Sequence, residues 1–193
     1  MKQLIILLII ASSISCSKRQ INLDYDSLSE YTIVTDNRAV ADTLNVYLKK
    51  SLGIELPIDN ELKGNNRYIH LKYNSDILSD FISLSFSNYS ITIQGNNSKM
   101  LSYGVYEFLE IFLGVRWYST DLTVVPEISS INIPLEKEII YKPSVTTRTV
   151  HSRLFYKDSS FADKLKVSNE AFPNYVPNAR VHTFHKFIPY EKF

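Results

Sequence analysis

Residues 103–126, YGVYEFLEIFLGVRWYSTDLTVVP, limit what this chain can fold into more than any other stretch. In this stretch and just before it, apolar side chains recur at steps of three and four, which places them on one face of a helix. They are Leu101, Val105, Phe108, Leu109 and Phe112. Gly104 shares that face and lets the helix approach a sheet closely, despite a cost of about 1 kcal/mol relative to alanine. Gly114 suits the C′ position, because glycine adopts positive φ without a Cβ clash. We therefore expect an amphipathic helix over residues 98–113 and an aromatic strand over 115–118.

A second helix with the same pattern is expected over residues 36–52, with Asp36 as its N-cap and Gly53 at its end. Its apolar stripe is Val40, Leu44, Tyr47, Leu48 and Leu52. Alternating and β-branched residues predict strands over 31–35, 67–73, 81–86 and 89–94, the last two forming a hairpin. Neither helix could bury its stripe without a sheet. The expected fold class is therefore α+β, a mixed β-sheet with two amphipathic helices packed on one face.

The first sixteen residues have the pattern of a bacterial export signal. Lys2 precedes the apolar run LIILLIIA, and small residues then lead to Cys16, the only cysteine. Residues 4–11 would span about 12 Å as a helix, against a hydrocarbon core of about 30 Å, so this run is too short to cross a membrane. Small residues before a lone cysteine resemble a lipobox, and the resemblance implies that Cys16 carries a lipid anchor. The alternative is an ordinary secretory signal with an incidental cysteine. Residues 17–30 are polar and are expected to form a tether.

Composition excludes some classes of partner. Lys and Arg total 21 against 20 Asp and Glu, a net charge of +1 that does not favour nucleic acid. Neither GxGxxG nor GxxxxGK[ST] occurs, so we expect no nucleotide site and no cofactor. The aromatic content of 12% suits sugar contacts as well as an ordinary β-rich core.

The segment ITIQGNNSKMLSYGVYEFLEIFLGVRWY, residues 91–118, resembles the small α+β domain that precedes the catalytic barrel in hexosaminidases and alpha-glucuronidases. The resemblance covers roughly residues 31–193 and is most specific over 103–118. It is nearest to lipid-anchored, glycoside-hydrolase-like proteins of uncharacterised activity. It implies an accessory domain over residues 31–139, followed by the start of a (β/α)₈-type barrel over 140–193. Lys142-Pro143 and Arg148 fit the stretch that opens the first barrel strand in such enzymes.

A complete barrel needs about 250 residues, far more than follow Tyr141. We therefore expect a truncated barrel region, and the alternative is a complete short protein with an irregular tail. Glycoside hydrolysis generally needs two facing carboxyl groups, about 5–9.5 Å apart, which the resemblance assigns to later barrel strands. We expect no catalytic residue here: Glu107 and Glu110 are expected on a solvated helix face, and Asp158 and Asp163 in a loop without a defined partner.

The resemblance implies that Arg148 contacts sugar hydroxyls, since a guanidinium presents a planar set of donors. Pairing with a nearby carboxylate is an equally good interpretation. His151 follows on the same segment as a weaker sugar-contact candidate, and His182 and His185 form an H-x-x-H that contacts sugar or solvent. Metal binding would need a third and usually a fourth ligand, so we expect no metal. Trp117 could stack on a sugar, but an aromatic residue directly after a capped helix favours the core.

Together these features predict a non-catalytic N-terminal domain of a cell-envelope glycoside-hydrolase-like lipoprotein acting in carbohydrate metabolism. Its expected partners are oligo- or polysaccharide through a barrel and a bacterial membrane through the lipid anchor, with no nucleic acid. The chain alone is expected to be inactive. The rival hypothesis is a non-enzymatic lipoprotein module that binds a glycan or a protein.

Overall fold

The computed structural model describes residues 19–64, 67–135, 137–145, 148, 150, 152, 154–155 and 158–167. Its centre is a six-stranded mixed sheet with the order β10-β5-β6-β4-β2-β3. β2, β3, β4 and β6 pair in parallel, and β5 and β10 pair antiparallel. The strands are β2 (Tyr31–Val34), β3 (Ile58–Asp59), β4 (Arg67–Tyr73), β5 (Ile82–Phe86), β6 (Ser90–Gly95) and β10 (Glu138–Tyr141).

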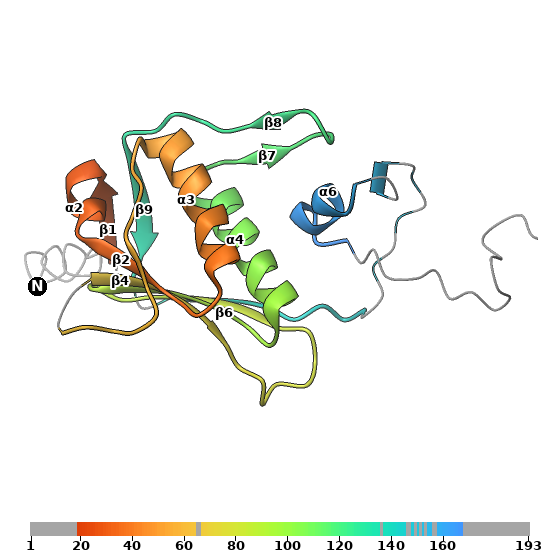
Figure 1. Cartoon of the computed structure of the whole chain (residues 1–193), viewed down its shortest axis with the longest axis horizontal. Helices are drawn as coiled ribbons and strands as arrows, with labels where there is room; N and C mark the ends of the chain where they lie inside the picture. Colours follow the sequence, from red (N-terminus) through yellow and green to blue (C-terminus); the bar gives the residue numbers. More distant parts are fainter. Residues whose placement is uncertain are drawn as a thin grey trace, which may run out of the picture.

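Two helices lie on one face of this sheet (Figure 1): α3 (Arg38–Leu52) and α4 (Ser98–Phe112), each of 15 residues. The expected fold class is confirmed. The side chain of Asn97 caps α4 by accepting from the Met100 N–H. The N-cap of α3 is Asn37, whose side chain accepts from the Val40 N–H, and the prediction of Asp36 was therefore wrong by one residue.

Strand alternation separates the two faces of the sheet. Ile33, Ile69 and Ile91 are fully buried in the core that α3 and α4 share. Tyr68 and His70 belong to the opposite face and are half-buried. Gly104 explains how closely α4 approaches, because a Cβ there would lie 2.8 Å from Ile93 Cγ2. The glycine predicted to permit close packing therefore does so.

The predicted tether was wrong over most of its length. Residues 20–29 form β1 (Gln20–Asp24) and α2 (Tyr25–Ser29), and β1 pairs antiparallel with β9 (Ser130–Pro134). Leu28 is fully buried and Leu23 is 3% exposed. A few scattered apolar side chains in a polar stretch are a weak sequence signal, yet Leu23 and Leu28 both belong to the core. This stretch therefore belongs to the folded body.

The strand predicted over 115–118 forms a separate ribbon, β7 (Arg116–Trp117) with β8 (Thr123–Val124). Trp117 is buried, in agreement with its expected place in the core. Its Nε1 donates to the Tyr47 hydroxyl over 2.9 Å, and its ring meets those of Tyr47 and Tyr106 edge-on. The ribbon thus closes over the seam between α3 and α4.

The accessory domain was expected to end at residue 139, and its sheet extends two residues further, to Tyr141. Glu138–Tyr141 is not a strand of a new unit, because it pairs with β5 as the edge of the same sheet. Beyond it, α6 (Ser159–Lys164) contacts α4. Among the described residues, no helix combines the length and apolar character needed to cross a bilayer.

Candidate functional site

Arg148 lies at the joint between the sheet and α6. Its Nη2 donates to Asp80 Oδ2 over 3.0 Å, and its side chain is 17% exposed. Its Nη1 donates to the Val145 carbonyl and its Nε to the Lys166 carbonyl. The structure thus contains the carboxylate pairing that the sequence left open, while the sugar contact stays a prediction. His151, His182, His185 and Cys16 lie outside the described residues.

Glu107 and Glu110 do not form the solvated face expected for α4. Lys166 Nζ lies 2.7 Å from Glu107 Oε2 and 2.9 Å from Glu110 Oε2, and the lysine side chain is 17% exposed. Burial acts to lower the pKa of Lys166, but the hydrogen bonds to Glu107 and Glu110 outweigh it and raise that pKa. The cluster therefore favours a charged lysine held between two carboxylates.

Asp158 and Asp163, expected in a loop without partners, both have defined contacts. Asp158 is the N-cap of α6 and accepts from the Phe161 N–H over 3.1 Å. Asp163 Oδ1 lies 3.3 Å from the Tyr103 hydroxyl, which also lies 3.2 Å from the Val167 carbonyl oxygen. Burial, and then the Asp163 charge, raise the pKa of Tyr103 well above its usual range. The phenol therefore stays a donor.

The cluster of Lys166, Glu107 and Glu110 is poorly suited to glycoside hydrolysis. That chemistry generally uses two carboxyl groups on opposite sides of the bond to be cleaved, with the substrate between them. Here Glu107 and Glu110 both pair with the ammonium group of Lys166, so the two carboxylates share one cation of the same chain. The arrangement joins two parts of the chain.

Sequence reasoning did not identify Lys166 as the partner of Glu107 and Glu110, or Asp80 as the partner of Arg148. Lys166 is 56 residues from Glu110, and Arg148 is 68 residues from Asp80. No local periodicity connects positions so far apart. The i, i+3 spacing of Glu107 and Glu110 was the only visible signal, and it could not identify a partner.

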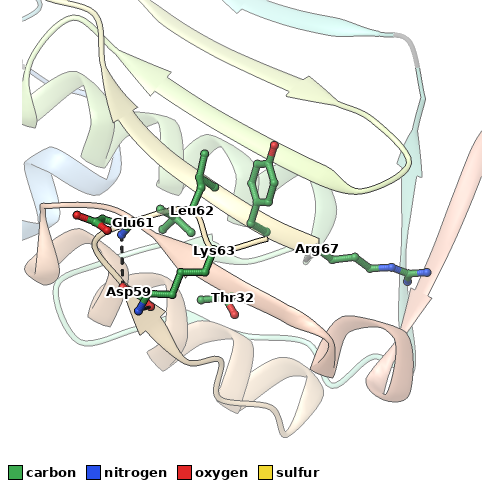
Figure 2. A pocket seen from close by; sticks show the side chains of 8 residues that line it. Thr32, Asp59, Glu61, Leu62, Lys63 and Arg67 are labelled. Atoms are coloured by element: carbon green, nitrogen blue, oxygen red, sulfur yellow. Dashed lines mark hydrogen bonds and ion pairs between the residues drawn. The ribbon is translucent and has the colours of Figure 1, made fainter. Parts of the chain in front are cut away.

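The described surface also has two shallow hollows. One, of about 80 Å³, lies where the loop after β3 meets β2 and β4, and its lining includes Thr32, Asp59, Lys63, Arg67 and Tyr68 (Figure 2). Another, of about 210 Å³, lies beside α3. Ligand pockets typically enclose about 300–1,000 Å³, so both are small for an oligosaccharide. The described ranges contain no group of three or more His, Cys, Asp or Glu residues that could hold a metal ion.

The fold is one that occurs in glycoside hydrolases. The chain is similar to a family GH115 4-O-methyl-alpha-glucuronidase with specificity for decorated arabinogalactans, at 19% identity and a TM-score of 0.50. That match covers 67% of this chain and 19% of the glucuronidase chain. No protein-family model matches the chain, and a search of curated proteins finds no match.

Two GH20 enzymes give weaker matches, both with a TM-score of 0.46. An exo beta-N-acetylglucosaminidase from Vibrio harveyi is 19% identical, with 69% of this chain and 18% of the enzyme covered. A beta-N-acetylhexosaminidase from Streptomyces coelicolor A3(2) is 17% identical, with 62% and 24% covered. The chain therefore spans at most about a quarter of these solved structures, and the likeness concerns the fold alone.

Proposed function

We propose that this chain is the non-catalytic N-terminal domain of a glycoside-hydrolase-like protein of the cell envelope, acting in carbohydrate metabolism. The observation that carries the proposal is the mixed sheet with α3 and α4 on one face, which matches part of a glucuronidase structure. A domain of this kind supports a neighbouring catalytic region through its packed surfaces. The substrate class we propose for the whole protein is oligo- or polysaccharide.

The ion pairs around α4 and α6 favour a structural role for this domain over a catalytic one. Glu107 and Glu110 both accept from Lys166, and Asp80 accepts from Arg148. Contacts of this kind link distant parts of one chain, as expected of residues that stabilise the fold. The chemistry would then lie in a region outside the described residues.

Two measurements test this proposal. The purified 193-residue chain should show no turnover of aryl N-acetylglucosaminides or aryl glucuronides, and measurable turnover would overturn the non-catalytic role. An antibody against this chain should detect, in the source cells, a protein much larger than 22.3 kDa. A native protein of that smaller mass would overturn the proposal that a catalytic region accompanies this domain.

The lipid anchor at Cys16 is a further proposal, supported by the apolar run and the small residues before the cysteine. Two or more acyl chains provide stable anchoring. Replacing Cys16→Ser should abolish fatty-acid labelling and release the chain from the membrane fraction, whereas Ser17→Ala should change neither. A Cys16→Ser protein that stays with the membrane would contradict the anchor.

A glycan-binding module is the second candidate, and the hollow beside β4 favours it. Its lining includes Tyr68, Arg67 and Asp59. The Asp59 carboxylate pairs with Lys63, and the Arg67 guanidinium extends toward Glu30 (Figure 2). Such groups contact sugars by stacking and by hydrogen bonds. Under this hypothesis, Tyr68→Ala should abolish retardation of the chain in gels that contain soluble polysaccharide. Equal mobility of both proteins with and without the glycans would remove this candidate.

A further inference from the structure

The end of α6 has an unusual backbone conformation. The Val167 N–H donates to the Ala162 carbonyl over 2.9 Å, and the Lys166 N–H donates to the Asp163 carbonyl over 3.0 Å. This pair of bonds is the Schellman motif, which requires a left-handed residue at C′. That residue is Lys166, with a φ of 57°. Among the described residues, it is the only one besides glycine with positive φ.

The two long helices each end at a left-handed glycine, which is the ordinary solution. α3 is followed by Gly53 with a φ of 73°, and α4 by Gly114 with a φ of 71°. A residue with a Cβ is disfavoured in this conformation, and such a residue persists where its surroundings require it. The lysine after α6 therefore indicates that its side chain supplies something that a glycine could not.

That side chain reaches across to α4. Its ammonium group lies between Glu107 and Glu110, at 2.7 and 2.9 Å from their nearest oxygens. The carboxylates are only 25% and 31% exposed, so water screens this interaction less than it screens a surface ion pair. Two acidic side chains of α4 thus bind Lys166, which anchors the turn after α6 to that helix.

Neighbouring contacts hold the same turn from two other sides. The Tyr103 hydroxyl, on α4, lies 3.2 Å from the Val167 carbonyl oxygen. Arg148 donates to the Lys166 carbonyl and to Asp80, which precedes β5. These contacts fix the backbone of Lys166 and Val167 as well as the lysine side chain.

An apolar centre underlies the charged contacts. Phe161 is 2% exposed and belongs to the main core, and Ala162 is fully buried. The ring of Phe155 packs against that of Phe161, with centroids 5.4 Å apart. An apolar centre with a polar rim is the usual anatomy of a specific protein interface.

We propose that the outer face of α4 is a docking surface for residues 158–167 of this same chain, with Lys166 as the anchor. Docking then fixes the direction in which the chain leaves the α+β body at Val167. The inference does not depend on the proposed function, because it concerns contacts within the described residues alone.

Hydrogen exchange on the full chain tests the role of Lys166. The discriminating variant is Lys166→Gly, since glycine relieves the backbone conformation while removing the anchor. We expect the amides of residues 161–167 to exchange about tenfold faster in this variant, with α3 unchanged. Equal or slower exchange in Lys166→Gly would overturn the proposal, because it would show that the turn needs only its backbone.

A charge exchange provides the rescue. Lys166→Glu alone should lose protection more severely than Lys166→Gly, and combining it with Glu107→Lys and Glu110→Lys should restore most of it. Lys164→Met is the matched control, because the described residues offer Lys164 no ion pair, and its protection should match that of the natural chain. Failure of the triple variant to regain protection while α3 stays protected would overturn the anchor. Protection that falls on dilution would also overturn the proposal. It would mean that residues 158–167 of a second copy, and not of the same chain, occupy α4.

Discussion

Helices α3 and α4 have the same length and the same kind of N-cap, and they lie on the same side of the sheet. Their outer faces differ. On α3, Arg38 pairs with Asp42, and Lys49 pairs with Glu55 just beyond the helix; all four side chains are more than half exposed. On α4, Glu107 and Glu110 are largely covered by the segment that carries Lys166. Ion pairs in water contribute little to stability, whereas breaking a covered pair leaves a charge without its partner. Similar charged residues thus solubilise one helix and join the other to the rest of the chain.

The largest expected effect tests the face that the helices share. In Gly104→Val, the new Cβ would lie 2.8 Å from Ile93 Cγ2 and 3.1 Å from Ile82 Cγ2 unless these side chains moved. Both atoms belong to β-branched side chains that cannot rotate away easily. We expect a loss of about 3 kcal/mol in the free energy of unfolding, measured by urea denaturation.

The control for this substitution is Ser102→Val, which adds the same side chain at a half-exposed position of α4. It should change stability by well under half as much. Equal losses in the two variants would mean that valine disfavours the helix itself and that close packing of α4 on the sheet is unimportant.

The next effect sharpens the contrast between the outer faces. A double-mutant cycle with Lys166→Met and Glu110→Gln should give a coupling energy of about 1.5 kcal/mol. The same cycle with Lys49→Met and Glu55→Gln should give none that denaturation can resolve, since both side chains are exposed. A coupling on α3 as large as that on α4 would show that burial does not distinguish the two helices.

The sequence predicted the shared features of the helices better than the differences. The stripes of α3 and α4, and the closing glycines Gly53 and Gly114, are local patterns with a clear period. Such patterns determine which face is buried, and the sheet follows because the stripes need cover. The Asp36 and Asn37 pair shows the limit, since either residue can cap a helix and only the geometry selects Asn37.

What covers the outer face of α4 could not be predicted, because the contacts join distant positions. The bond between Lys166 and Glu110 spans 56 residues, and that between Tyr103 and Asp163 spans 60. The Arg148 candidate was identified from a resemblance, yet its partner Asp80 had no sequence signal. Similarly, the alternation in residues 20–24 was too short to reveal that β1 pairs with β9.

A smaller effect compares two buried phenols. The hydroxyl of Tyr31, on β2, has no hydrogen-bond partner among the described residues, while that of Tyr103 has two possible acceptors. Since an unpaired buried hydroxyl destabilises the fold, Tyr31→Phe should raise the free energy of unfolding by about 1 kcal/mol. Tyr103→Phe should lower it by a similar amount. Urea denaturation of both variants would contradict this comparison if Tyr31→Phe proved the more destabilising.

The smallest effect is spectroscopic and concerns the tyrosines of α4. Burial, followed by the nearby Tyr47 and Asp163, raises the pKa of Tyr106 from 10.0 to about 12. Because the folded state binds the phenol proton more tightly than the unfolded chain does, this contribution to stability is fully present below pH 10. It is lost as the pH rises from about 10 to about 12.

An alkaline titration followed by tyrosinate absorbance in the near ultraviolet measures this shift. The folded chain should show a late phase, and Tyr106→Phe should remove part of it, whereas the chain in concentrated urea should titrate in one step near pH 10. A folded chain that titrates like the denatured one would mean that water reaches the seam between α3 and α4. In that case, the ribbon that carries Trp117 would not exclude water from between α3 and α4, and α6 would be the element that covers α4.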